Sequence, residues 1–285
     1  MTRWLTVLAP GPLTTVQDLG RPGQARWGVS PSGAADRRSL RLANRLVANH
    51  ESAAGLECTL GGLAARAHGE LVVAVTGAPA RVTVAGREVA LNAPVRLGDG
   101  AELRIGSPAA GLRSYLAVRG GLLVEPELGS RSSDLLSGLG PAPVRAGDDL
   151  PVGDPPVQPP PVDVAAVHGV GQAELSLRVL PGPRTDWFVA DALDTLLSGA
   201  YEVTPDTNRV GIKLSGPALA RRVEAELPSE GLVRGALQVP PAGQPVLFLA
   251  DHPVTGGYPV LAVVVDPDTD LAAQARPGST IRFRR

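Results

Sequence analysis

Short runs in which apolar and polar residues alternate, separated by glycine-containing turns, dominate the chain. Residues 81–84 and 88–91 flank the turn-prone Gly86-Arg87 and predict a β-hairpin. Strands this short and this closely spaced are typical of β-barrels and β-sandwiches. Further runs of this kind are residues 71–75, 101–105, 113–118, 175–179, 245–249, 259–265 and 280–283.

Helical spacing of apolar residues is confined to three segments. Residues 36–48 place apolar side chains on one face of a helix that ends at Asn49. Residues 185–198 show the same spacing, and Gly199 lies just past their end. A short third helix is expected over residues 270–275. The predicted fold class is therefore mainly β, a β-rich α+β fold with one main helix in each half.

A proline-rich stretch divides the chain. Six of the eleven residues from Pro151 to Pro161 are proline, which favours an extended and stiff segment. We therefore expect an N-terminal barrel-like domain over residues 1–150, a linker over 151–165 and a C-terminal domain over 166–285.

Composition narrows the class of function. A formal net charge of −1 argues against binding to nucleic acid or to a membrane surface, and 44% hydrophobic residues argue against disorder. No stretch approaches the roughly 18 uninterrupted apolar residues of a membrane span. The single Cys58 cannot form an internal disulfide, and the N-terminal residues lack the apolar core of a signal peptide. We therefore expect a cytoplasmic protein.

Familiar catalytic motifs are absent from the sequence. Lys213, the only lysine, does not lie in a phosphate-binding G-x-x-x-x-G-K-[ST] loop. The four histidines, at positions 50, 68, 168 and 252, are too scattered to predict a zinc site. Cys58 has apolar neighbours and is interpreted as a buried, inert thiol. A stand-alone enzyme built on a familiar local motif is therefore disfavoured.

Polar residues gather instead in three turn-rich segments, where binding and catalytic residues tend to lie. They are residues 14–36, 119–133 and 235–259.

In these segments the chain resembles the family of the 5-oxoprolinase C subunit, also called allophanate hydrolase subunit 2 or KipA-like and related to the carboxyltransferase domain of urea carboxylase. The family patterns are T-V-Q-D-x-G-R, G-V-x-x-S-G-A-x-D, A-N-x-L-x-x-N, Y-L-A-x-x-G-G, L-G-S-R-S, I-Q-V-P-x-x-G-x-P and D-x-Q-T-T-G-G-Y-P. The chain departs from the last two patterns at Leu237, Pro253 and Val254. The matching residues are, in order, 15–21, 28–36, 43–49, 115–121, 128–132, 237–245 and 251–259.

The resemblance implies a fold, a reaction and partners. The fold would contain two cyclophilin-like β-barrels. The reaction would be the hydrolysis of a small lactam, 5-oxoproline, to glutamate, with ATP and Mg²⁺ as cofactors. The chain would act with a KipI-like B subunit in a hetero-oligomer, expected to be a heterotetramer, and with a third subunit. No Met-Lys biotinylation signal surrounds Lys213, so no covalent biotin is expected.

Two carboxylates and a histidine are the candidate catalytic groups. Asp18 and Asp251 are suited to ligate Mg²⁺ or to accept a proton, and His252 lies beside Asp251. The alternatives are that Asp18 caps a turn and that His252 is an exposed loop residue.

The candidate binding groups are rich in arginine and glycine. Phosphoryl transfer needs positive charge and accurate positioning, which guanidinium and backbone N–H groups supply. Each arginine has the alternative of pairing with a local acid, such as Asp18 for Arg21. The alternatives for the glycines and the tyrosine are backbone freedom and core packing. The set is Gln17, Arg21, Ser32, Arg131, Arg209, Gln238, Thr255, Gly256, Gly257 and Tyr258.

Two other functions remain open from the sequence. One is a non-catalytic, KipA-like regulatory protein that antagonises a kinase inhibitor, which the altered residues at 253 and 254 favour. The other is a carboxyltransferase-type subunit related to urea carboxylase and allophanate hydrolase, to which biotin would arrive on another protein.

Overall fold

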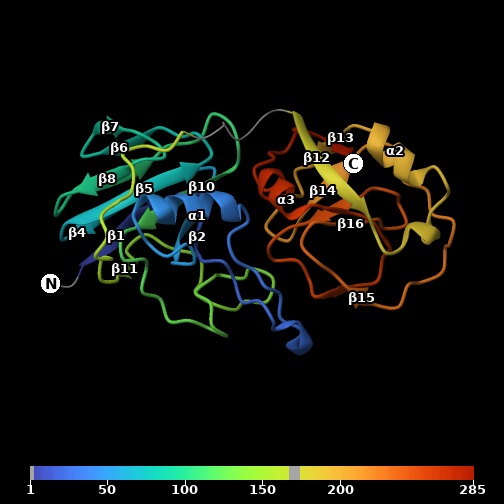
Figure 1. Ribbon diagram of the computed structural model, residues 1–285, viewed down its shortest axis with the longest axis horizontal. Coiled ribbons are helices and arrows are strands. Elements are labelled where there is room, and N and C mark those ends of the chain that lie inside the picture. The colour runs from blue at the N-terminus through green and yellow to red at the C-terminus, as the bar shows by residue number, and fades with distance from the viewer. Residues whose placement is uncertain (1–2, 167–173) are drawn as a thin grey trace. The chain divides into compact units, whose positions relative to one another are not determined.

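The computed structural model describes residues 3–166 and 174–285, and the chain divides into two compact units (Figure 1). Residues 167–173, which include His168 and follow the expected boundary at 166, lie outside the described part. Unit 1 is drawn from Met1–Arg21, Asp36–Asp134 and Gly138–Val170, and unit 2 from Pro22–Ala35, Leu135–Ser137 and Gly171–Arg285.

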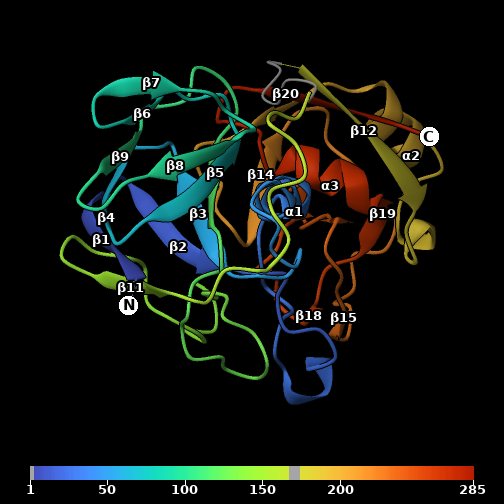
Figure 2. The same cartoon turned by 60° about the vertical axis from the view of Figure 1, so that its left-hand side comes forward.

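Unit 1 contains two antiparallel sheets whose apolar faces share one hydrophobic core (Figure 2). The six-stranded sheet has the order β11 (Asp149–Val152), β1 (Arg3–Pro10), β4 (Leu63–His68), β9 (Glu102–Ile105), β6 (Val82–Val84) and β7 (Arg87–Val89). The five-stranded sheet has the order β2 (Leu13–Gln17), β3 (Gly55–Thr59), β10 (Arg113–Val118), β5 (Leu71–Gly77) and β8 (Pro94–Leu97).

Helix α1 (Arg37–Leu46) packs against the five-stranded sheet, on strands β3, β5 and β10. Asp36 caps its N-terminus, because its side chain accepts a hydrogen bond from the Ser39 backbone N–H at 2.9 Å. The helix lies close to the sheet at Gly55, where a Cβ atom would come within 3.2 Å of Leu40 Cδ1 on α1 and within 2.7 Å of the Leu116 carbonyl oxygen on the neighbouring strand β10. Glycine at this position therefore permits the close packing of helix and sheet.

Unit 2 is built around a closed barrel of seven strands. Leu177, Ile212 and Leu247 lie inside its core and are fully buried. Strands β12 and β20 are parallel, and the other neighbours are antiparallel. The order is β12 (Glu174–Pro181), β19 (Val260–Val264), β16 (Ala236–Gln238), β17 (Val246–Phe248), β14 (Gly211–Ser215), β13 (Tyr201–Val203) and β20 (Thr280–Arg284).

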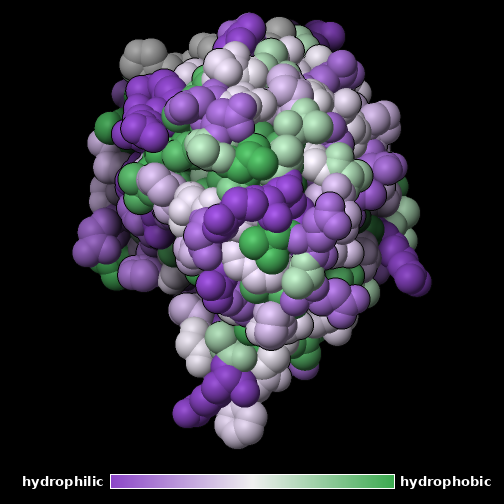
Figure 3. All heavy atoms as spheres, turned by 90° about the vertical axis from the view of Figure 1, so that its right-hand side faces the viewer, coloured by the Kyte–Doolittle hydropathy of each residue, from purple (hydrophilic) through white to green (hydrophobic). Residues whose placement is uncertain are grey.

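Short elements complete unit 2. A two-stranded sheet pairs β15 (Glu230–Gly231) with β18 (Thr255–Gly256). The helical segments are η1 (Ala25–Trp27), η2 (Thr185–Trp187), α2 (Ala192–Ser198) and α3 (Asp266–Ala272). One face of the molecule shows hydrophobic residues scattered among hydrophilic ones, as is ordinary for a folded surface (Figure 3).

The β-rich fold is confirmed, and each alternating run that predicts a strand contains one. The hairpin forms between β6 and β7, and its turn residues Ala85 and Gly86 both have positive φ, at 48° and 77°. Such a turn matches the right-handed twist of the strands. The closed barrel belongs to unit 2, whereas the strands of unit 1 form the two sheets. The segment expected as a linker from residue 151 begins within β11.

The expected single helix over residues 185–198 is wrong. The chain forms η2 and α2 instead, and Phe188 between them is extended, with ψ 163°. Phe188 forms a β-bridge with Arg221, and the Val189 N–H donates to the Ala220 carbonyl. Pairing with a distant segment therefore outweighs the local helical preference. The third helix begins at Asp266, four residues earlier than expected. No helix in residues 3–166 and 174–285 has the length and apolar character needed to span a bilayer.

Cys58 gives a first test of the unit 1 core. Its side chain is fully buried, and burial raises the pKa of the thiol to about 12. Since the thiolate is the reactive form, iodoacetamide at pH 8 should modify the native chain at least roughly 100-fold more slowly than the unfolded chain. Mass spectrometry of timed samples, with and without guanidinium chloride, measures the ratio. Equal rates would show that β3 does not form the buried strand described here.

Candidate functional site

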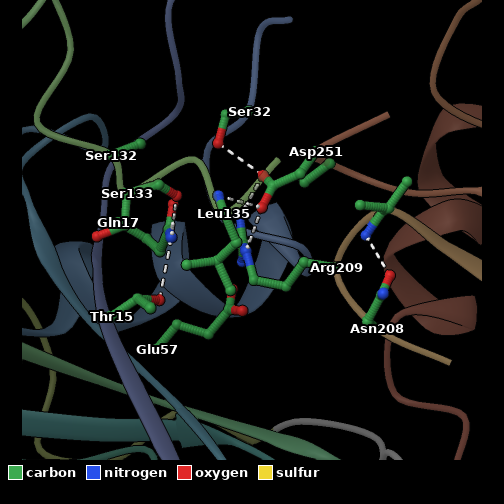
Figure 4. A network of polar contacts seen from close by, with 12 residues as sticks. Thr15, Gln17, Ser32, Glu57, Ser132, Ser133, Leu135, Asn208, Arg209 and Asp251 are labelled. Carbon is green, nitrogen blue, oxygen red and sulfur yellow. Dashed lines mark hydrogen bonds and ion pairs between the residues drawn. The ribbon is translucent and has the colours of Figure 1, made fainter. Parts of the chain in front are cut away.

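Unit 2 contains a buried ion pair between Asp251 and Arg209. The Asp251 carboxylate has no exposed surface, and the Arg209 side chain is 2% exposed. Arg209 donates from Nε to Oδ2 and from Nη2 to Oδ1, each at 2.9 Å (Figure 4). This two-pronged geometry is the strongest that arginine and a carboxylate form.

The same carboxylate holds two other segments of unit 2. Ser32 Oγ donates to Oδ1 at 2.7 Å, and the Leu135 backbone N–H donates to Oδ2 at 3.2 Å. Arg209 Nη2 also donates to the Gly33 carbonyl at 2.6 Å. Ser32 has a φ of 51°, a left-handed conformation that is uncommon for serine. The ion pair therefore ties residues 32–33 and 135 to the barrel.

These contacts determine what Asp251 is able to do. Its two oxygens accept four hydrogen bonds, two of them from a buried cation. Proton transfer or metal binding at Asp251 would require breaking the pair with Arg209 and would leave that charge buried without its counterion. The geometry thus supports an anchoring role for both residues.

His252 follows Asp251 and is buried, not exposed. Its Nδ1 atom lies 2.8 Å from the Pro253 carbonyl oxygen, so Nδ1 carries the proton of that hydrogen bond. The ring centroid lies 6.5 Å from that of Phe248. These contacts fix the imidazole against the barrel wall.

Asp18 is the corresponding anchor of unit 1. It is 7% exposed and accepts hydrogen bonds from the Ser130 hydroxyl at 2.6 Å, the Gly20 N–H at 2.7 Å and the Arg131 N–H at 2.7 Å. The Ser132 hydroxyl donates a fourth. The carboxylate therefore closes its own turn and also fixes the segment 130–132, which is more than the local turn capping considered from the sequence.

Arg21 does not pair with Asp18. Its Nε donates to the Glu127 carbonyl at 3.4 Å, and its Nη2 donates to the Ser132 carbonyl. Arg131 likewise donates from Nε to a carbonyl, that of Val124, at 2.7 Å. Both guanidinium groups therefore hold the loop that follows β10.

Gln17 lies on the same strand end as Asp18. Its Nε2 donates to Thr15 Oγ1 at 3.0 Å and to the Ser133 carbonyl at 2.9 Å (Figure 4). Gln17, Asp18 and Arg21 therefore converge on residues 130–133, which the motif spacing alone did not establish.

A charged network on the α1 face of the five-stranded sheet was not predicted. The Tyr115 hydroxyl donates to Glu57 Oε2 at 2.8 Å and accepts from the Asp36 N–H at 2.8 Å. Arg113 Nε lies 3.4 Å from Glu57 Oε1. Burial, and then the negative charges of Glu57 and Asp36, raise the pKa of Tyr115 well above its ordinary value. A sequence signal was available, because Glu57 is the single charged residue in the apolar run 54–60.

The remaining candidates lie near β18 in unit 2. Gln238 Nε2 donates to the Tyr258 carbonyl at 2.9 Å. A Cβ atom at Gly256 would come within 2.5 Å of Gln238 Nε2, so a larger residue there would displace the Gln238 side chain. Neither Gly256 nor Gly257 has a positive φ, so the segment lacks the alternating backbone of an anion nest. Gly257 and Tyr258 line a groove of about 480 Å³, with Arg221, Glu224, Ala225, Glu226, Leu227 and Pro241.

The expected Mg²⁺ has no ready-made set of ligands in the described residues. No group of three or more His, Cys, Asp or Glu side chains is placed there to hold a metal ion. Asp18 and Asp251, the carboxylates expected to bind it, are engaged as anchors. A Mg²⁺ ion that is bound to nucleotide phosphates needs few protein ligands. The lack of a three-residue metal site in the described residues is therefore compatible with the binding of Mg²⁺ together with a nucleotide.

The fold and motifs place the chain in a known family. Residues 27–285 match the family described as carboxyltransferase domain, subdomain A and B, and the chain belongs to it. It is similar to the C subunit of 5-oxoprolinase from Escherichia coli (strain K12), with 37% identity over 284 residues, 98% of this chain and 90% of that protein. It is 31% identical to the C subunit of 5-oxoprolinase from Haemophilus influenzae over 272 residues, 94% of this chain and 87% of that protein. The resemblance seen in the motifs is thereby confirmed.

Solved structures show the same fold within longer chains. TTHA0988 has a TM-score of 0.90 at 37% identity, covering 100% of this chain and 56% of that chain. The K. lactis urea amidolyase has a TM-score of 0.90 at 30% identity, covering 98% of this chain and 18% of that chain. The chain therefore spans about half of the first protein and under a fifth of the second.

The anchoring role of Asp251 predicts a large stability effect. Asp251→Asn keeps the shape of the side chain but leaves Arg209 without its counterion, so the free energy of unfolding should fall by about 3–5 kcal/mol. Urea unfolding followed by circular dichroism measures the change.

Asp206→Asn is the matched control for Asp251→Asn. Asp206 pairs with Lys213 at 3.4 Å, but the two side chains are 76% and 59% exposed. Removing this pair should change the free energy of unfolding by less than about 1 kcal/mol. Similar small effects at both positions would contradict the anchoring role.

Proposed function

We propose that the chain is one component of an ATP-dependent 5-oxoprolinase-type complex, which converts 5-oxoproline to glutamate together with a KipI-like B subunit. The observation that carries the proposal is the likeness to the C subunit of 5-oxoprolinase along nearly the whole chain and across 90% of the E. coli protein. A match of this extent covers both units and not one shared domain.

The chemistry of the substrate explains why such a complex uses ATP. The lactam is a resonance-stabilised amide, and phosphorylation of its oxygen would make the ring carbon electrophilic. Water would then add, the C–N bond would open to leave an acyl phosphate, and a second water would hydrolyse this to the carboxylate and inorganic phosphate. Transfer of this kind depends on positioning and positive charge more than on a covalent nucleophile. A chain with 27 basic residues, all but one arginine, is suited to that task.

The site geometry supports a division of labour between the components of the complex. Asp18 and Asp251, the carboxylates of the two most distinctive motifs, each accept four hydrogen bonds within the described chain. We therefore assign binding and positioning of the substrate to this chain, and proton transfer to groups of a partner protein.

A carboxyltransferase-type function is the second candidate. The family name and the likeness to urea amidolyase favour it. In that case the chain would act on a carboxyl group delivered by another protein, and urea would replace the lactam as substrate.

Co-expression with the KipI-like partner tests the proposal. The purified complex with its third subunit should form ADP and glutamate in equal amounts when 5-oxoproline and Mg-ATP are added, and omission of this chain should abolish both. Coupled assays for ADP and glutamate measure the products, with urea in place of 5-oxoproline as the comparison. When a carboxylated biotin carrier protein is also added, transfer of its carboxyl group with urea but not with 5-oxoproline would favour the carboxyltransferase candidate. A stable complex inactive with both substrates would reject the proposal in favour of a regulatory binding protein.

A further inference from the structure

Among the described residues, three arginines are almost completely buried, and one of them differs from the other two. Arg113 pairs with Glu57, and Arg209 pairs with Asp251. Arg21 is 1% exposed and forms no ion pair with a carboxylate in the described residues. Arginine stays charged in proteins, and buried charges are normally matched by a counterion. Arg21 is therefore the exception that needs an explanation.

One nitrogen of Arg21 has no hydrogen-bond partner. Nε and Nη2 donate to the carbonyls of Glu127 and Ser132, whereas Nη1 is buried and donates to nothing in the described part of the chain. Asp18 lies on the other side of Ser132, bonded to its hydroxyl, and so balances part of the charge. It does not satisfy the N–H groups of Nη1.

Gln17 carries a buried acceptor atom that also lacks a hydrogen-bond partner. Its Oε1 atom is buried and accepts no hydrogen bond from the described residues. The amide is not simply reversed, because Nε2 donates to two oxygen atoms, Thr15 Oγ1 and the Ser133 carbonyl. A donor and an acceptor in the same motif thus both lack partners.

The two side chains act on neighbouring peptide groups. Arg21 holds the carbonyl of Ser132, and Gln17 holds the carbonyl of Ser133. Consecutive residues lie only about 3.8 Å apart along the chain, so both side chains reach the same short segment. Buried polar groups left without partners cost free energy, so each calls for an explanation, and a bound molecule that completes the bonding of both atoms is one.

We propose that Arg21 Nη1 and Gln17 Oε1 bind a small molecule in which a carboxylate is adjacent to an N–H group. Arg21 donates to the carboxylate, and Gln17 accepts from the N–H. A cyclic amido acid such as 5-oxoproline has this arrangement, so the inference rests on the proposed function and names the substrate-recognition groups. Both atoms are buried, so ligand entry requires the segment after Ser130 to move.

Ligands that each lack one recognition group test the assignment. The probes are 5-oxoproline, its methyl ester, which lacks the anionic carboxylate, and N-methyl-5-oxoproline, which lacks the N–H. Isothermal titration calorimetry on the complex of this chain with its partner, without ATP, gives the three affinities. The wild-type complex should bind 5-oxoproline at least about tenfold more tightly than either analogue.

The two variants should have separate effects. Arg21→Met should abolish the preference for the acid over the ester and retain the preference for the N–H over the N-methyl compound. Gln17→Met should do the reverse. Ratios of affinities do not depend on the fraction of a variant that is folded, so partial unfolding cannot imitate this crossed result. Arg45→Met, on a helix face where the Arg45 side chain is 55% exposed, is the control and should keep both preferences.

Other results would overturn the inference. If both variants weaken all three ligands equally, or change none, the two atoms only hold a water molecule or stabilise the loop. Failure of the wild-type complex to bind 5-oxoproline would overturn it as well. The proposed function is judged separately by glutamate formation, so glutamate production with unchanged preferences in both variants would reject only this inference.

Discussion

A charge inside a protein must be matched by a counterion or by hydrogen bonds, and this requirement shapes both units. In unit 2, Asp251 matches Arg209 and in doing so holds residues 32–33 and 135 to the barrel. In unit 1, Asp18 gathers the hydroxyl and N–H groups of residues 130–132. Removing either carboxylate would therefore release the polar contacts that hold a loop in place.

This constraint separates two kinds of buried polar residue that look alike in a motif. Asp18 and Asp251 have their bonding capacity filled by the chain itself, so they position other groups. Arg21 and Gln17 keep one donor and one acceptor unfilled in the described structure. The motif T-V-Q-D-L-G-R therefore combines an anchor at Asp18 with binding groups on either side of it.

The sequence was most informative where local rules decide the structure. Alternation of apolar and polar residues located strands. The expected hairpin also formed, with its turn at Ala85-Gly86, one residue before the expected Gly86-Arg87, because these two residues adopt the positive φ that such a turn needs. Residues 185–198 show where such rules fail, since Phe188 leaves the helical conformation to pair with Arg221. The closed barrel of unit 2 depends on pairings such as β12 with β20, which no local pattern reveals.

The sequence identified most residues of the candidate site, but it did not show what each residue does there. Gln17, Asp18, Arg21, Ser32 and Asp251 were all selected from motifs, yet their partners come from distant segments and could not be read from spacing. Arg209 illustrates the point, because its partner Asp251 follows it by 42 residues. Glu57 and Arg113 were missed, although a single charge inside an apolar run is itself a signal, because burial makes a partner for it obligatory.

Anchoring and binding are thus assigned to different buried residues. A crystal structure of the complex of this chain and its partner, grown with 5-oxoproline, tests this assignment most directly. We expect a ligand carboxylate oxygen within hydrogen-bond distance of Arg21 Nη1, the lactam N–H directed at Gln17 Oε1, and the Arg209–Asp251 pair unbroken. A ligand bound to Arg209 or Asp251, with their pair opened and only water beside Arg21, would contradict it.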